Sequence, residues 1–271
     1  MPCNTPLNKI SFSSILAITA TLLILSITCI DTAAEDKGLA IAREWDRRDS
    51  GYNDYSAIMI MTLRSAEGKE AVRKMRMLDI EVEGDGDKSI LVFDEPNDVE
   101  GTALLTWSHK FKDDDSWIYL PSLSRVKRIS SNNKSGAFMG SEFAFEDIGS
   151  QEVEKFSYKF IEESALNGQP CYVVDLVPVY ANSGYSRQRV WYDKPEYRIV
   201  KIDYYDHRKE LLKTVQILDY KRYLERFWLP GQYEMVNHKT ERSTTLLIQN
   251  YKLRNGYTQR DFEPTGLERI R

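Results

Sequence analysis

The sequence is poor in the residues on which most catalytic and metal sites depend. It holds three cysteines and three histidines in 271 residues. The histidines, His109, His207 and His238, lie far apart in the chain, and no HExxH, GxSxG or CxxC motif occurs. We therefore predict that the protein is not an enzyme and has no metal site or cofactor, and that each histidine is a surface or strand residue. A hydrolase site assembled from distant residues by folding stays open.

Two short acidic runs, at residues 85–87 and 113–115, are the remaining candidates for cation binding. Neither run has the order of oxygen ligands that an EF-hand loop requires. We expect hydrated hairpin tips at both places.

The sequence also lacks a strong excess of either charge. Its 37 lysines and arginines nearly balance its 41 acidic residues, which gives a formal net charge of -4. A general nucleic-acid binder needs a large positive excess to meet the phosphates. This composition therefore excludes that class of protein.

The N-terminus has the order of segments that is typical of a secretory leader. Residues 1–9 are polar with one positive charge, residues 10–30 are largely apolar, and small residues lead up to Ala34. This order predicts a signal peptide at residues 1–34, cleaved after Ala34, followed by one domain at residues 35–271. Two alternatives stay open, because the apolar stretch is long enough to remain as a membrane anchor and Cys29 is a candidate for lipid modification.

Cleavage of this leader would leave Cys171 as the one remaining cysteine. No internal disulfide can then form, so stability has to come from burial and from the hydrogen bonds of the sheet. Cys171 lies in the apolar strand pattern PCYVVDLVP. We expect a buried, unreactive thiol.

Most of the chain has the pattern of short strands. An amphipathic helix is expected at residues 35–49, and Asn-Gly and Asp-Gly turns then recur between β-branched and aromatic runs. About a dozen strands joined by short hairpins predict a mainly β fold, a single antiparallel meander with a few helices. Because twist accumulates across strands, the sheet has to curl, and an unfilled centre would become an apolar cavity closed by helices.

Methionine and aromatic residues mark the candidate walls of such a cavity. Methionine is flexible and polarizable, which suits a surface that accepts ligands of varied shape. Ordinary core filling explains the methionines equally well, and strand parity alone does not decide which face is concave. The predicted lipid-binding residues are Met59, Met61, Met75, Met77, Leu91, Phe93, Trp107, Trp117, Tyr119, Phe138, Met139, Phe143 and Phe145.

A basic stretch with Arg125, Lys127 and Arg128 lies in one predicted strand. It is interpreted as a solvated edge that discourages aggregation. The alternative is contact with lipid headgroups or an acidic partner, where each cation near an anionic membrane contributes ~1 kcal/mol.

The stretch from Trp117 to Gly149 resembles the signature of a known family. The residues that carry the resemblance are Trp117, Tyr119, Pro121, the basic strand 125–129, the Phe-Met-Gly-Ser-Glu-Phe turn 138–143, and Glu146-Asp147. They are similar to the LolA-like outer membrane lipoprotein-sorting proteins, in the branch associated with RND-type lipid exporters. Ala144-Phe145 departs from the family pattern, in which a more polar pair is expected, and the family's lid-locking arginine is not assigned to any residue here.

The resemblance implies a curved antiparallel half-barrel, helices that close an apolar cavity, and a periplasmic location. We expect a periplasmic carrier that binds lipid or lipoprotein acyl chains and moves them between membranes, or to and from an inner-membrane RND/MMPL-type transporter. Contact with the membrane surface is expected, and nucleic acid is not. The alternative is a periplasmic lipid sensor or adaptor subunit that regulates a membrane protein partner.

Overall fold

The computed structural model describes residues 32–130 and 133–270. The predicted leader lies outside these residues except for residues 32–34, which are helical together with residues 35–49. The helix expected at residues 35–49 is therefore confirmed. Within the described ranges, no helix is both long enough and apolar enough to span a membrane.

Fifteen strands follow this N-terminal helix in the described part of the chain. They are β1 (Asp54–Arg64), β2 (Glu70–Ile80), β3 (Lys88–Glu95), β4 (Ala103–Trp107), β5 (Asp115–Leu120), β6 (Arg125–Ile129), β7 (Phe156–Leu166), β8 (Gln169–Pro178), β9 (Arg187–Asp193), β10 (Ile199–Tyr205), β11 (Leu211–Leu218), β12 (Lys221–Tyr223), β13 (Phe227–Leu229), β14 (Gln232–Asn237) and β15 (Ser243–Leu253). Short 3-10 helices join or follow them: η1 (Pro121–Leu123), η3 (Phe138–Gly140), η4 (Phe145–Asp147), η5 (Val153–Lys155), η6 (Gln259–Phe262) and η7 (Pro264–Arg269).

Thirteen of these strands form one antiparallel sheet in the order β6-β5-β4-β3-β2-β1-β15-β14-β11-β10-β9-β8-β7. The sheet consists of two meanders, joined where β1 pairs with β15 along Tyr55 to Arg64. Strands β12 and β13 form a separate hairpin. The sheet is not closed, because β6 and β7 remain as its two edges. The prediction of a mainly β antiparallel meander is confirmed.

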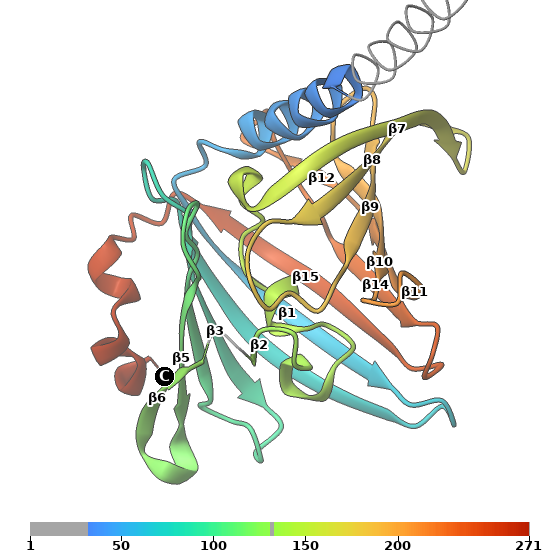
Figure 1. Cartoon of the computed structure of the whole chain (residues 1–271). Coiled ribbons are helices and arrows are strands. Elements are labelled where there is room, and N and C mark those ends of the chain that lie inside the picture. The colour runs from blue at the N-terminus through green and yellow to red at the C-terminus, as the bar shows by residue number, and fades with distance from the viewer. Residues whose placement is uncertain (1–31, 131–132, 271) are drawn as a thin grey trace, which may run out of the picture.

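Bulges help to curve the sheet. The register shifts at Ser56/Ile58 in β1, at Lys74/Met75 in β2 and at Phe160/Glu162 in β7. A bulge bends its strand and increases the local twist. The two halves of the sheet consequently curve around a common interior, as the ribbon in Figure 1 shows.

Strand alternation separates two apolar clusters on opposite faces. In β3, Leu91 and Phe93 join the large interior cluster, whereas Ile90 and Val92 join a smaller one. The smaller cluster is covered by Phe262 and Leu267 of the C-terminal 3-10 helices, which lie outside β4 to β6 in Figure 1. Strands β3 and β4 are therefore covered on both faces.

The segment from residue 133 to residue 155, here named the crossing segment, connects the two edge strands of the sheet. It follows β6 and precedes β7, so the chain has to pass from one edge to the other. Its contact with the middle of the sheet is direct, because the backbone N–H of Glu142 donates to Thr244 Oγ1 of β15 at 3.0 Å. The crossing segment therefore lies over the interior.

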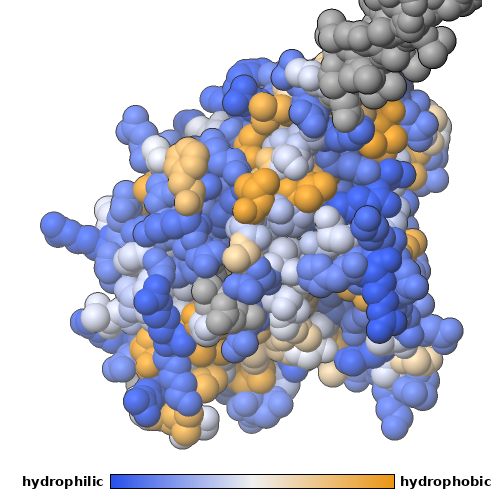
Figure 2. Space-filling view, in the orientation of Figure 1, coloured by the Kyte–Doolittle hydropathy of each residue, from blue (hydrophilic) through white to orange (hydrophobic). Residues whose placement is uncertain are grey.

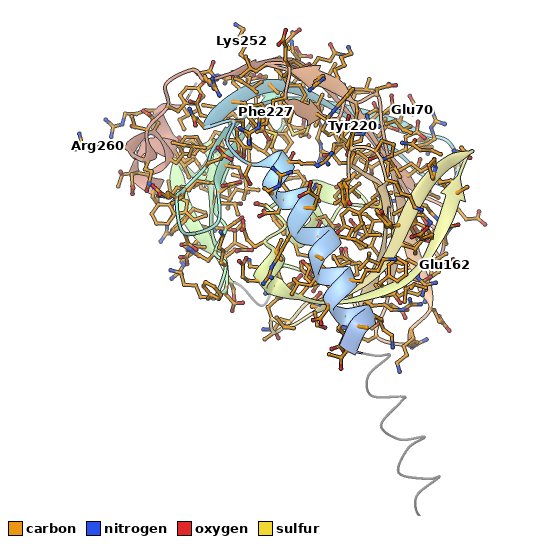
Figure 3. The ribbon with its side chains drawn as sticks, turned by 90° about the horizontal axis from the view of Figure 1, so that it is seen from above. Glu70, Glu162, Tyr220, Phe227, Lys252 and Arg260 are labelled. Atoms are coloured by element: carbon orange, nitrogen blue, oxygen red, sulfur yellow. The ribbon has the colours of Figure 1, made fainter. Side chains whose placement is uncertain are left out.

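The N-terminal helix also lies over the interior, where it packs on β7. Gly38 lets the two backbones approach, since a Cβ at this position would lie 2.8 Å from the Phe160 nitrogen. Ile41 and Ala42 of the helix are buried in the interior cluster. Seen from above in Figure 3, the helix runs across the curved sheet.

Candidate functional site

A cavity of about 520 Å³ lies between the inner face of the sheet, the end of the N-terminal helix and the crossing segment. Strands β1, β2, β3, β10, β11, β14 and β15 all contribute lining residues. Its size falls within the range of about 300–1,000 Å³ that small-molecule pockets occupy.

Part of the lining is apolar, because inward-facing residues of adjacent strands meet there. Met59 of β1 and Met77 of β2 both line the cavity, and Met77 pairs across the strands with Leu91 of β3. Further apolar lining residues include Phe143, Ile148, Phe156, Ile199, Ile202, Val215, Ile217, Leu229, Leu246 and Ile248. Residues from both meanders therefore share one apolar wall.

Tyrosine rings cover much of the remaining lining. They come from Tyr52, Tyr55, Tyr180, Tyr204, Tyr220, Tyr233 and Tyr251. Tyr55 and Tyr251 contact each other with ring centroids 5.5 Å apart. Burial raises the pKa of both hydroxyls well above the ordinary value, so they stay neutral.

Two carboxyl groups share one tyrosine beside the cavity. The Tyr52 hydroxyl lies 2.7 Å from Asp79 Oδ1 and 3.2 Å from Asp87 Oδ2. Burial, with nearby acids, raises the pKa of Asp79 to about 7 and that of Asp87 to about 8. The pair therefore holds protons at neutral pH that free aspartates would release.

A third carboxyl group, that of Asp49, lies at the C-terminal end of the helix and also lines the cavity. Burial raises the pKa of Asp49 to about 7, and repulsion from Asp46 and Glu81 acts in the same direction. Asp49 is consequently only partly ionised at neutral pH.

Cationic side chains also line the cavity, and two of them, Arg198 and Arg226, have partners of their own. Arg198 Nε donates to Asp193 Oδ2 at 2.6 Å, and its guanidinium carbon lies 4.6 Å from the Trp228 ring. Arg226 Nη2 donates to the carbonyl oxygen of Ser50 at 2.9 Å. The arginines therefore fix the loops around the cavity.

The crossing segment is anchored to the sheet by aromatic packing. Phe138 is buried, and its ring centroid lies 6.0 Å from that of Phe93 and 5.5 Å from that of Phe145. The segment folds back on itself there, since the N–H of Phe138 donates to the carbonyl oxygen of Phe143 at 2.7 Å. Phe143 then lines the cavity.

A buried ion pair adds a polar anchor to the same segment. Lys213 Nζ of β11 lies 2.7 Å from Asp147 Oδ2 and 2.8 Å from the carbonyl oxygen of Glu142. The side chains of Lys213 and Asp147 are only 5% and 2% exposed. The Tyr185 hydroxyl donates to the same carboxylate, at 2.9 Å from Oδ1. This network fixes the crossing segment over the sheet.

The predicted lipid-binding residues divide into four groups. Met59, Met77, Leu91 and Phe143 line the cavity. Met61, Met75, Phe93 and Phe138 are buried in the surrounding core, and Met139 and Phe145 pack against it half-buried. Trp107, Trp117 and Tyr119 pack instead against the smaller cluster on the opposite face of the sheet. They are placed there by strand parity, which puts them in line with Ala103 and Leu105.

The basic stretch lies in β6, an edge strand of the sheet, as the solvated-edge interpretation requires. Arg125, Lys127 and Arg128 are exposed. Arg128 is paired with Asp115 and its guanidinium carbon lies 5.9 Å from the Trp117 ring. This leaves Arg125 and Lys127 as the more accessible charges of the stretch.

The expectations for the histidines and the acidic runs were partly wrong. His109 follows β4 and is buried, with Nδ1 2.6 Å from Asp85 Oδ2 and Nε2 3.2 Å from Asp115 Oδ2. Although burial raises the pKa of Asp85, its bonds from His109 and Lys110 bring the value to about 2. Both acidic runs therefore form hydrogen bonds or ion pairs with other residues of the chain. Among the described residues, no group of three metal-ligating side chains is placed to hold an ion.

Cys171 is free and buried, as expected, and burial raises the pKa of its thiol. The tyrosine lining, Asp49 and Trp228 were not predicted from the sequence. Their positions come from several strands and loops that only the fold brings together.

Comparison with solved structures identifies the family. A domain from Vibrio parahaemolyticus, named an outer membrane lipoprotein-sorting protein domain, is 46% identical in sequence and superposes with a TM-score of 0.85. The match covers 86% of this chain and 99% of that chain. The chain belongs to the outer membrane lipoprotein-sorting family.

Two further solved structures share the fold. A DUF1329 family protein from Desulfovibrio piger is 28% identical with a TM-score of 0.82, over 86% of this chain and 99% of that chain. A LolA superfamily protein from Nitrosomonas europaea is 19% identical with a TM-score of 0.67, over 83% and 96% of the two chains, which shows that the fold is LolA-like.

Sequence comparisons add little about function. A family model described as "Uncharacterized protein" matches residues 85–269. No curated protein matches the chain. The predicted resemblance to LolA-like lipoprotein-sorting proteins is confirmed by the solved structures, at the level of the family and of the fold.

Proposed function

We propose that the protein is a periplasmic carrier, rather than an enzyme, that binds the acyl chains of lipids or lipoproteins in the cavity. The observation that supports this most directly is the apolar wall shared by Met59, Met77 and Leu91 with the strands of the second meander. Each methylene group removed from water contributes about 0.8 kcal/mol. Binding in a cavity of this size would therefore provide a substantial part of the free energy gained when an acyl chain is transferred out of water.

The proposal separates wall residues from core residues. Met59, Met77, Leu91 and Phe143 would contact the acyl chain, while Phe93, Phe138 and the other buried residues of the interior cluster would support them. Trp107, Trp117 and Tyr119 are left out, because they pack on the opposite face of the sheet.

The exposed edge strand β6 supports a second part of the proposal. We infer that Arg125 and Lys127 contact an anionic membrane surface or an inner-membrane RND-type transporter while cargo is exchanged. Both side chains are exposed on an edge of the sheet. Each cation near an anionic membrane contributes about 1 kcal/mol, so the contact would be weak and reversible.

Filling the cavity tests the proposal. Ile217→Trp places a large ring on β11 in the cavity lining, and Val236→Trp places the same ring on β14, where the side chain is 42% exposed. We expect a fluorescent fatty-acyl probe to bind the unmodified protein and the Val236→Trp variant equally. Ile217→Trp should weaken binding at least tenfold.

Thermal unfolding shows whether the two variants are folded, since overpacking costs roughly 1–3 kcal/mol. Should Ile217→Trp not fold, Leu246→Trp on β15 fills the same cavity. Absence of probe binding to the folded unmodified protein would contradict the carrier proposal. Equal binding by all folded variants would show that the acyl chain binds elsewhere.

A further inference from the structure

Three chain segments meet at the end of the cavity where the N-terminal helix stops. Arg48 Nη1 donates to the carbonyl oxygen of Pro195 at 3.1 Å, and Arg226 joins the β12–β13 hairpin to Ser50. In Figure 3, Phe227 of this hairpin and Tyr220 lie on the side of the molecule where the helix ends. The segments that carry Asp49, Tyr220 and Trp228 therefore form one wall.

Trp228 leaves a buried hydrogen-bond donor at this wall. Its Nε1 atom is buried and has no hydrogen-bond partner among the described residues, although Trp228 lines the cavity. An unsatisfied buried donor costs about 1–3 kcal/mol. A ligand that offers an acceptor here would remove that cost.

Asp49 and Tyr233 add two further polar side chains to the lining of the same cavity. Both line the cavity, and they are close enough for the Asp49 carboxylate to raise the pKa of the Tyr233 hydroxyl, after the larger effect of burial. Burial raises the pKa of the Tyr220 hydroxyl, and Tyr233 and Asp49 act in the same direction. Arg198, whose guanidinium also covers the Trp228 ring, opposes this rise. Two hydrogen-bond donors, Trp228 Nε1 and the Tyr233 hydroxyl, thus line the same cavity as the acceptor Asp49.

The position of Asp49 is costly for the helix itself. It is the last helical residue, and a negative side chain is unfavourable at the C-terminal end of the helix dipole. Asp49 follows Trp45 by one helical turn, so the two side chains share the face that lines the cavity. A residue that opposes local stability in this way is expected at a functional position.

We propose that Asp49, Tyr233 and Trp228 form a subsite for an uncharged polar group of the cargo that carries both a donor and an acceptor, such as the amide of an N-acyl chain. The carbonyl oxygen would accept from Trp228 Nε1 and the Tyr233 hydroxyl, and the amide N–H would donate to Asp49. A free fatty carboxylate offers no donor and places a second negative charge beside Asp49. This inference rests on the proposed acyl-chain carrier function and specifies its substrate class.

Three ligands with the same total number of carbon atoms test the subsite: palmitamide, palmitate and hexadecylamine. Each displaces a fluorescent fatty-acyl probe from the unmodified protein at neutral pH. We expect palmitamide to bind about tenfold more tightly than palmitate, which corresponds to about 1.4 kcal/mol. Hexadecylamine, which satisfies Asp49 but not Trp228, should bind more weakly than palmitamide.

Variants assign the preference to the proposed residues. Asp49→Asn should raise palmitate affinity until the two ligands bind about equally, and Trp228→Phe should weaken palmitamide binding about fivefold, as expected for one lost hydrogen bond. Trp191→Phe on β9, outside the cavity lining, is the matched control and should change neither affinity. Tyr233→Phe replaces Trp228→Phe as the donor variant if the latter does not fold.

The outcomes separate the two proposals. Equal affinity for the three ligands, or tightest binding of palmitate or of the amine, would overturn the subsite and leave the carrier function standing. Failure of every ligand and of the probe to bind the folded protein would overturn the carrier function and the subsite together.

Discussion

The buried pair of Lys213 and Asp147 gives the sharpest prediction about stability. Lys213→Met removes the ammonium that lies 2.7 Å from the Asp147 carboxylate and leaves that carboxylate almost fully buried. Removing one partner of such a pair costs about 3–5 kcal/mol, because the remaining charge is neither hydrated nor neutralised. Against a total stability of about 5–15 kcal/mol, this is a large loss.

Urea unfolding followed by circular dichroism measures the effect. With a slope of about 3 kcal/mol per molar urea, the midpoint should fall by roughly 1–2 M. Lys74→Met is the matched control, since Lys74 and Glu95 form an exposed pair at 3.6 Å. It should leave the midpoint almost unchanged, because exposed pairs contribute little.

The double variant with Asp147→Asn completes the test. Because the two side chains contact each other directly, their effects on the free energy of unfolding should not add. The loss in the double variant should be smaller than the sum of the two single losses by about 0.5–3 kcal/mol. Hydrogen exchange should become faster in the crossing segment of Lys213→Met. A loss below about 1 kcal/mol, or additive effects, would refute the role of this pair as an anchor.

Three further predictions concern the rest of the fold. Gly38→Ala should lower the thermal unfolding temperature measurably, since the new Cβ would lie 2.8 Å from the Phe160 backbone nitrogen; an unchanged temperature would contradict this docking. Phe138→Ala should cost about 3–5 kcal/mol in urea unfolding, as buried aromatic truncations do, and a cost below 1 kcal/mol would contradict its burial. The protonated states of Asp79 and Asp87, with pKa values of about 7 and about 8, contribute stability that is complete below about pH 4 and is lost as the pH rises toward 8. Urea midpoints should therefore fall between about pH 5 and pH 8, and Asp87→Asn should flatten the fall.

Local patterns were enough to predict the strands and the overall class of fold. The alternation of Phe156, Tyr158 and Phe160 with Ser157 and Lys159 is observed in β7, where the latter two are exposed. Hairpin turns predicted the neighbours that follow each other directly in the chain, but not the pairing of β11 with β14, which have β12 and β13 between them. The pairing of β1 with β15 could not be predicted, because it joins residues almost 200 positions apart and no turn specifies it.

Three of the predicted lipid-binding residues lie on the face of the sheet opposite the cavity, because the sequence does not show which strand face is concave. Trp117 and Tyr119 have the bulk and polarity that suit a ligand wall, yet they lie on the face that the C-terminal 3-10 helices cover. Periodicity says which residues share a face, but the direction of curvature decides which face becomes the interior. That direction depends on bulges and on the path of the crossing segment.

Hydrophilic side chains dominate the face of the molecule that lies toward the viewer in Figure 1. The face shown in Figure 2 is mostly hydrophilic, with hydrophobic side chains gathered near the N-terminal helix and beside the β5–β6 hairpin. The net charge and the hydrophilic surface are consistent with a carrier that keeps its apolar wall turned inward.

The most direct test of the account is native mass spectrometry of the protein isolated gently from its own cells. We expect a bound species at one copy per chain whose mass, after organic extraction, corresponds to an acylated molecule. The Ile217→Trp variant should lose this species, whereas Val236→Trp should retain it. A folded protein that is repeatedly recovered without any acylated ligand, or that retains it equally in both variants, would contradict the claim that this cavity carries acyl chains.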